Sequence, residues 1–202
     1  MKHTKQTGHG RGDGLLPQRA GDRVFAAASD LFRNQGIRAV GVETIVKKAG
    51  VAKISLYRSF ESKDDLIVTY LNKINATYWA NVDQYLARHD NDPRSQVRAY
   101  MTFIAKSATT PGYRGCPFIN YSAEFPDPSH PGHRVAEANR FEMRRRLLGW
   151  ATALKAAHPA KLADSLLLLI DGAYASSQIL GGPKGPAAML VWAADALIAG
   201  AA

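Results

Sequence analysis

The chain has 202 residues and a formal charge of +9, with 46% hydrophobic and 21% charged residues. This composition is typical of a globular protein and excludes a disordered chain. A single cysteine, Cys116, excludes an internal disulfide and favours a reducing, cytoplasmic setting. The apolar stretches are shorter than the roughly 20 residues that a membrane-spanning helix needs, so we expect no membrane partner.

The positive charge is concentrated in the first third of the chain. Residues 1–63 hold 12 Lys/Arg and 5 Asp/Glu, a net charge of +7, whereas residues 64–202 hold 14 and 12, a net charge of +2. This division indicates one segment that meets a polyanion and a second segment with another task. A solubilising excess of charge is the simpler alternative.

The first elements are predicted in chain order as an arm and four helices. Residues 1–17 are rich in Gly, Lys, His and Thr and predict a flexible basic arm. Apolar residues then recur at spacings of three and four, which predicts a helix from about Gln18 that ends in a left-handed turn at Gly36. Further helices are expected at Val42–Ala49, at Ala52–Phe60 and from a capping box at Ser62–Asp65 towards Arg88.

Five further helices are expected at about residues 93–107, 116–125, 134–157 and 159–180 and from 187 to the C-terminus, with proline or glycine at most of their boundaries. No stretch alternates with a period of two. The predicted fold class is therefore all-α with about nine helices. A three-helix unit over residues 18–65 is followed by a larger helical domain over residues 66–202.

The two short helices joined through Gly50 have the arrangement of a helix-turn-helix. Gly50 tolerates the positive φ that such a turn needs. In the second of these helices, Val51, Leu56 and Phe60 are expected to face inward, which leaves a polar and basic face outward. A helix with that exposed face fits a DNA major groove.

Residues 19–71 resemble the DNA-binding region of the TetR family of transcriptional regulators. The matching residues are Arg23-Val24, Ala27-Ala28, Leu31-Phe32, Gly36, Val42, Ile45, Ala49-Gly50-Val51, Leu56-Tyr57, Phe60, Ser62-Lys63 and Leu66. Ala52 departs from the family pattern because a capping serine or threonine is common there, and Ile54 departs because a small residue is frequent there.

The resemblance implies DNA contacts from one set of residues: Thr44, Lys53, Ile54, Ser55, Tyr57, Arg58 and Lys63. Tyr57 and Lys63 are expected at phosphates, which fix the register, while Lys53 and Arg58 reach either phosphates or a guanine edge. Ile54 is expected either to touch a thymine methyl group or to lean into the core. The alternatives are a packing role for Tyr57 and a solvated role for Lys63.

The resemblance also implies that the larger domain dimerises. Its last two helices carry more apolar surface than one face requires, and we expect a four-helix interface from Leu162, Leu166, Leu169, Ala173, Leu190, Trp192, Ala193 and Leu197. The alternative is that these residues close the core of the protomer.

The resemblance further implies a small-molecule effector, whose site we place around the stretch Tyr113–Phe125. Polar anchors in a mostly apolar cavity are expected from this stretch and from aromatic residues elsewhere: Phe103, Cys116, Phe118, Asn120, Tyr121, Glu124, Trp150 and Tyr174. Cys116 precedes a helix and is a hypothetical electrophile sensor if its pKa is lowered there. The alternative is a small buried hydrophobe.

We expect no catalytic residues, no cofactor and no metal. Asp127, His130 and His133 have a spacing that could bind a metal, but prolines constrain the loop and no further ligand is evident. The predicted function is a homodimeric repressor on a double-stranded DNA operator at the nucleoid, released by an unknown small-molecule effector. The alternatives are a redox or electrophile sensor acting through Cys116, and a helical ligand-binding protein or enzyme without DNA binding.

Overall fold

The computed structural model describes residues 19–89 and 91–201. The predicted basic arm at residues 1–17 lies outside the described residues. Within them the chain forms nine α-helices and one short 3-10 helix, and no strand, so the prediction of an all-α fold is confirmed. No helix in this part is long and apolar enough to cross a membrane.

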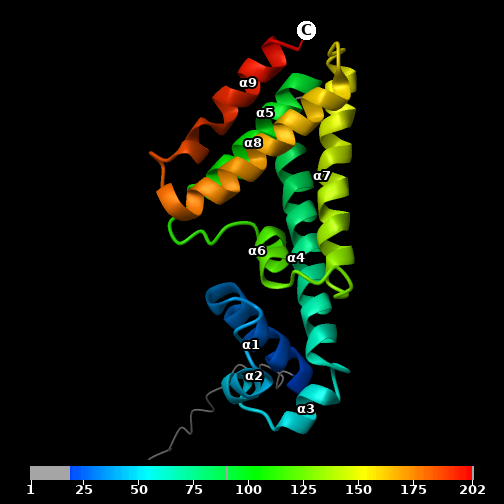
Figure 1. Cartoon of the computed structure of the whole chain (residues 1–202), viewed down its shortest axis with the longest axis vertical. Coiled ribbons are helices and arrows are strands. Elements are labelled where there is room, and N and C mark those ends of the chain that lie inside the picture. The colour runs from blue at the N-terminus through cyan, green and yellow to red at the C-terminus, as the bar shows by residue number, and fades with distance from the viewer. Residues whose placement is uncertain (1–18, 90, 202) are drawn as a thin grey trace, which may run out of the picture.

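Three helices form a unit at one end of the elongated molecule (Figure 1). They are α1 (Ala20–Gln35), α2 (Val42–Ala49) and α3 (Lys53–Tyr57). Val24 of α1, Ile45 of α2 and Leu56 of α3 are fully buried and form the core of the unit. This burial explains why such short helices persist, because helices of five to eight residues are unstable in isolation.

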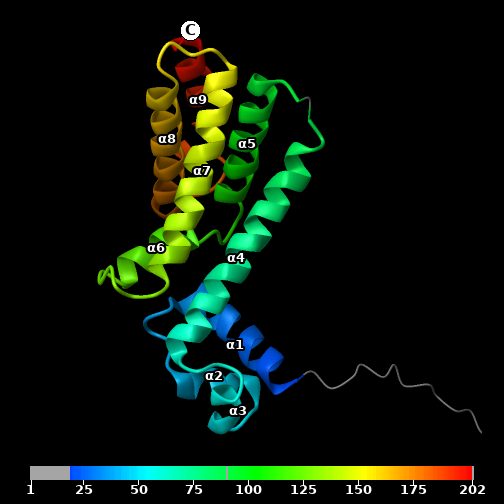
Figure 2. The same cartoon turned by 90° about the vertical axis from the view of Figure 1, so that its right-hand side faces the viewer.

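Helix α4 (Lys63–Leu86) runs without interruption from the three-helix unit into the larger domain (Figures 1 and 2). The hydroxyl of Ser62 caps it by accepting the backbone N–H of Asp65 at 3.0 Å, as predicted. The carboxylate of Asp65 accepts the N–H of Glu61 rather than that of Ser62. The cap is therefore only half of the expected reciprocal box. The predicted domain boundary at residues 65–66 falls inside this helix.

The larger domain packs its helices around α5 (Pro93–Ala108) and α8 (Pro159–Leu180). Helix α7 (His133–Ala153) lies along α8, and the chain ends in a 3-10 turn (Pro186–Met189) and α9 (Leu190–Ala199). The short helix α6 (Pro117–Glu124) lies at the lower end of this domain, next to the three-helix unit (Figures 1 and 2). Asp92 caps α5 by accepting the N–H groups of Arg94 and Ser95.

Some helix ends differ from their predictions for local reasons. Helix α7 stops at Ala153, earlier than expected, and Lys155 adopts a left-handed φ of 57° two residues later. Gly36 has φ 86° and ψ 157°, which is a positive-φ turn but not the predicted left-handed helical one. Helix α3 spans five residues instead of nine, since the chain turns at Arg58.

Candidate nucleic-acid interface and ligand cavity

Helix α3 is fixed to the protein by one side only. Gly50 adopts φ 62° and ψ 41°, the left-handed conformation that the turn between α2 and α3 requires. After this turn Leu56 is fully buried, and Val51 and Phe60 are partly buried against the core. Because these residues anchor one side, the opposite side of α3 faces away from the protein at the far end of the molecule (Figure 1).

The outward side of α3 exposes two large side chains to solvent. Ile54 is 59% exposed and Tyr57 is 45% exposed. Lys53 and Arg58 beside them are also exposed. Ile54 therefore does not lean into the core, which removes one of the two roles considered for it. A mixed apolar, hydroxyl and cationic surface of this kind suits thymine methyl groups, base edges and phosphates.

The cations near this surface are partly neutralised by acids of the same unit. The ammonium of Lys53 lies 2.7 Å from a carboxylate oxygen of Glu43, and this hydrogen bond raises the pKa of Lys53. Lys48 is paired with Asp30 in the same way. Arg58 has no ion pair within the described part of the chain. It is therefore the cation of α3 that is immediately available to an outside anion.

The other predicted contact residues occupy different surroundings. Thr44 is exposed on α2, and Ser55 is half-buried. Lys63 is the first residue of α4 and is also half-buried, with its ammonium 3.5 Å from the carbonyl oxygen of Arg38. Burial lowers the pKa of Lys63. Lys63 is therefore not a freely solvated lysine, because it lies against the loop that follows α1.

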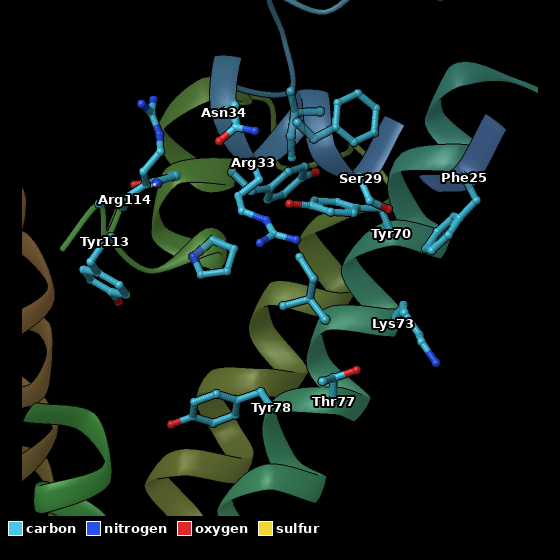
Figure 3. A pocket seen from close by; sticks show the side chains of 18 of the residues that line it. Phe25, Ser29, Arg33, Asn34, Tyr70, Lys73, Thr77, Tyr78, Tyr113 and Arg114 are labelled. Carbon is cyan, nitrogen blue, oxygen red and sulfur yellow. Dashed lines mark hydrogen bonds between the residues drawn. The ribbon is translucent and has the colours of Figure 1, made fainter. Parts of the chain in front are cut away.

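A cavity of about 540 Å³ lies where the three-helix unit meets the larger domain (Figure 3). This volume is within the usual range for small-molecule sites. Its walls come from α1, α4, the segment that precedes α6, and α6 itself. The lining side chains include Phe25, Ser29, Phe32, Arg33, Asn34, Ile37, Tyr70, Lys73, Ile74, Thr77, Tyr78, Asn81, Tyr113, Arg114, Pro117, Asn120 and Tyr121.

Only Asn120 and Tyr121 of the predicted effector residues line this cavity. Phe118 and Tyr174 are buried in the core, and Trp150 packs against Tyr100. Phe103 contacts the ring of Tyr78, behind the cavity wall. The other aromatic residues of the predicted pocket thus lie outside this cavity and pack among α4, α5, α7 and α8, and the predicted effector site stays a prediction.

The sensing hypothesis for Cys116 is not favoured. Cys116 precedes α6 as expected, but its side chain is only 5% exposed. Burial raises the pKa of the thiol, and the nearby guanidinium of Arg140 offsets this only in part. Reactive cysteines have lowered pKa values and are accessible. The alternative of a small buried hydrophobe agrees with the structure.

The predicted dimer face also needs a correction. Leu162, Leu166, Ala173 and Leu190 are buried inside the protomer, and Leu169, Ala193 and Leu197 are partly buried there. Trp192 alone of the eight is largely exposed, at 67%. The physical reason is that α8 is apolar around most of its circumference, so its spacing does not reveal which side faces the core.

The lower end of the larger domain is tied to the three-helix unit by Glu124. Its carboxylate accepts the backbone N–H of Arg38 at 2.6 Å, while the guanidinium of Arg38 donates to the carbonyl oxygen of Glu124 at 3.2 Å. Glu124 is therefore an interdomain contact rather than a cavity residue.

The histidines of the following loop are also engaged locally. The imidazole Nδ1 of His130 lies 2.6 Å from the Tyr121 hydroxyl, and His133 hydrogen-bonds to the carbonyl oxygen of Phe125. In the described part of the chain, no group of three His, Cys, Asp or Glu residues could hold a metal ion.

Sequence reasoning missed the side of the cavity that α1 provides. Phe25, Ser29 and Arg33 follow one another at intervals of four, and Tyr70, Ile74 and Tyr78 do the same on α4. Such spacing places each set on one helix face. The sequence therefore contains the pattern of both helix faces. A cavity forms only because the face of α1 and the face of α4 meet in the folded protein.

Comparison with known proteins agrees with this arrangement. Residues 24–69 match the family described as bacterial regulatory proteins, tetR family. The TetR-family transcriptional regulator SCO4454 from Streptomyces coelicolor is 30% identical, with a TM-score of 0.85 over 92% of this chain and 91% of that one. The TetR-type regulator sav143 from Streptomyces avermitilis is also 30% identical, with a TM-score of 0.72 over 88% and 99%.

Curated relatives match over shorter stretches. The transcriptional activator FasR of Mycolicibacterium smegmatis is 34% identical over 111 residues, or 53% of this chain and 49% of that protein. The regulator YxaF of Bacillus subtilis is 33% identical over 44% of each chain. The matches thus span about half the length of these relatives. With its helix-turn-helix unit, its all-α fold and its similarity to SCO4454 along nearly the whole chain, this protein belongs to the TetR family of DNA-binding transcriptional regulators.

Proposed function

We propose that the chain is a homodimeric repressor that reads a two-fold operator through α3 and leaves it when a small molecule binds. The observation that carries this proposal is the asymmetry of α3, with Leu56 fully buried and Ile54 59% exposed. A regulator needs both properties, because the anchored side fixes the geometry of the exposed side on the DNA.

The proposed DNA contacts have different tasks. Tyr57 and Lys63, with Thr44 on α2, contact phosphates and set the register. Arg58 and Lys53 reach phosphates or a guanine edge. Ile54 lies against a thymine methyl group, which is the contact that an exposed aliphatic side chain makes in a major groove. Ser55 contacts the DNA backbone or a base edge from beside Ile54.

The proposed dimer face is a stripe of exposed apolar and small residues on α8 and α9. Leu168 is 73% exposed and Ile179 is 84% exposed, and Gly172 and Ala175 lie between them on the same side of α8. We include Trp192 of α9 in this face because its side chain is also largely exposed. Exposed apolar surface of this extent is typical of a homodimer interface, and small residues let two such helices approach closely.

We propose that α4 carries the effector signal, since one helix connects both domains. An effector can release the operator only if it binds the two arrangements of the domains with different affinities. Repression is the proposed sign of regulation, although FasR, matched over half its length, is named as an activator.

Selection of bound fragments from a genomic library with the purified chain tests this function. We expect enrichment of an inverted repeat whose half-sites lie roughly one helical turn, ~34–36 Å, or a multiple apart, with two protomers per site. Weaker enrichment of the same repeat by Arg58→Ala serves as the control. A reporter driven by the selected site should rise when the gene is deleted, and no enrichment or a falling reporter would refute the proposal.

A further inference from the structure

The cavity between the two domains is lined by positively charged side chains, and no acidic residue in its wall balances their charge. Arg33, Lys73 and Arg114 line it, and no aspartate or glutamate does. None of these three side chains makes an ion pair or a hydrogen bond to any residue that the structure describes. Several other arginines of the larger domain are paired with acids, among them Arg98 with Asp195 and Arg144 with Asp164.

The rest of the wall is mainly apolar. Phe25 and Ile37 come from the three-helix unit, and Ile74 and Tyr78 from α4. The hydroxyl oxygen of Ser29 lies in the same wall, is buried, and has no hydrogen-bond partner in the described part of the chain. A buried hydroxyl without a partner is costly, and rotation of the Ser29 side chain towards the cavity would let the hydroxyl donate to an anionic oxygen there.

The side chains are arranged around one central cation. Figure 3 shows the guanidinium of Arg33 reaching from α1 across the middle of the cavity, beside Tyr70. Arg114 lies on one side of it, and Lys73 lies at the opposite edge with its ammonium directed outward. Arg33 is thus placed to bind an anionic group directly, and the other two contribute a long-range positive potential.

We propose that this cavity binds an organic anion with an apolar, partly aromatic body, and that Arg33 is its anchor. A carboxylate, sulfonate or phosphate pairs with Arg33 and accepts from Ser29, while the body lies among Phe25, Ile74 and Tyr78. The identification of this ligand as the effector rests on the proposed function. The existence of the binding site does not depend on that function. Because α1 moves with α3 and the other walls belong to α4 and α6, an occupant contacts both domains at once.

Two matched fluorescent probes test the site. The aromatic sulfonate 8-anilino-1-naphthalenesulfonate carries the expected anionic group, and N-phenyl-1-naphthylamine is the same scaffold without it. Each is titrated into the wild-type chain, Arg33→Gln and Arg88→Gln, an exposed arginine just beyond the other end of α4. Thr77→Trp fills the cavity without removing a cation. Probe binding that is lost in this variant therefore takes place in the cavity.

We expect Arg33→Gln to raise the Kd of the sulfonate by about ten- to a hundredfold, the range for losing a charge-assisted hydrogen bond. Arg88→Gln should change it less than twofold, and the neutral probe should be insensitive to both substitutions. Thr77→Trp should abolish the sulfonate binding that Arg33 controls. Equal sulfonate binding by the wild type and Arg33→Gln, or unchanged binding by Thr77→Trp, overturns the proposal. Circular dichroism of each variant checks that it is folded.

Operator affinity without any probe is measured in parallel. If the chain binds no DNA while the sulfonate still depends on Arg33, the proposed function fails and the site stands. If DNA binding is normal while the Kd of the sulfonate is the same in the wild type and Arg33→Gln, the proposed site is wrong and the proposed function stands.

Discussion

The carboxylate of Glu124 accepts the backbone N–H of Arg38 at 2.6 Å, which joins α6 to the loop after α1 across 86 residues of sequence. A second hydrogen bond, from the guanidinium of Arg38 to the carbonyl oxygen of Glu124, supports the same junction. This pair therefore helps to set how the three-helix unit is held beneath the larger domain, and its removal has a measurable consequence.

We expect Glu124→Ala to lower the free energy of unfolding by about 1.5–3 kcal/mol, the range for losing a hydrogen bond to a charged group. Amide hydrogen exchange at Arg38 should become faster. Thermal unfolding and exchange mass spectrometry measure both effects. Glu137→Ala is the control, because Glu137 is exposed on α7 and has no ion pair within the described residues. Identical behaviour of the two variants would contradict the role of Glu124.

Ala52 is the N-cap of α3 and supplies no side-chain hydrogen bond to the helix, as its departure from the family pattern predicted. Its extended backbone conformation, φ −73° and ψ 149°, suits a serine cap. We expect Ala52→Ser to stabilise the chain by about 1 kcal/mol, or roughly 2–4 °C in Tm. Ala80→Ser, in the middle of α4, should have the opposite sign because serine is a weaker helix former than alanine. A Tm that falls in Ala52→Ser would refute this.

Glu43 holds Lys53 in an ion pair that competes with DNA. Glu43→Gln should release the lysine and strengthen operator binding at low salt by up to about fivefold, the upper range for an exposed ion pair. Fluorescence anisotropy measures the affinity. The substitution is repeated in a Lys53→Gln background, where the gain should largely disappear. An equal gain in both backgrounds would show that Glu43 acts only through general repulsion of the DNA.

Tyr57→Ala and Lys63→Ala should weaken binding to all duplexes by similar factors, because contacts to phosphates carry no base information. Arg58→Ala should in addition change the base preference at one position of each half-site. Binding to a set of single-base operator variants separates these outcomes. An unchanged preference in Arg58→Ala would place Arg58 at a phosphate.

Glu142 on α7 has its pKa lowered to about 2 by hydrogen bonds to Arg145 and then to Arg146. Because the folded pKa lies below the ordinary value of 4.5, its stabilisation is complete above that pH and is lost as the pH falls towards 2. Glu142→Gln should cost about 1 kcal/mol at pH 7, since the exposure of Arg145 screens the pair. The difference from wild type should vanish near pH 2. A constant difference from pH 7 to pH 2 would contradict this assignment.

The sequence predicted best where local chemistry determines the structure. Gly50 required a left-handed turn and has one, and the ends of α2 and α8 were predicted residue by residue because glycine or proline marks them. The exposed side of α3 was also predictable. A five-residue helix with one apolar side turns that side to the core, so the opposite side faces solvent.

Properties that arise from tertiary packing could not be predicted in this way. A position before a helix suggests a lowered pKa for Cys116, but burial by α7 and its neighbours has the larger effect. Similarly, α8 is apolar on two sides, so Leu166 was assigned to the interface although it is in the core and Leu168 is exposed. The cavity with Arg33 requires two domains to meet, which no single stretch of sequence specifies.

The most direct test of the central claim is the equilibrium binding of the purified chain to its selected duplex as a function of salt. If the outward side of α3 reads DNA from each protomer of a dimer, log K should fall linearly and steeply with log salt. Two chains should bind each duplex, and Arg58→Ala together with Tyr57→Ala should reduce the affinity. An affinity that is independent of salt, or unchanged by these substitutions, would contradict the account.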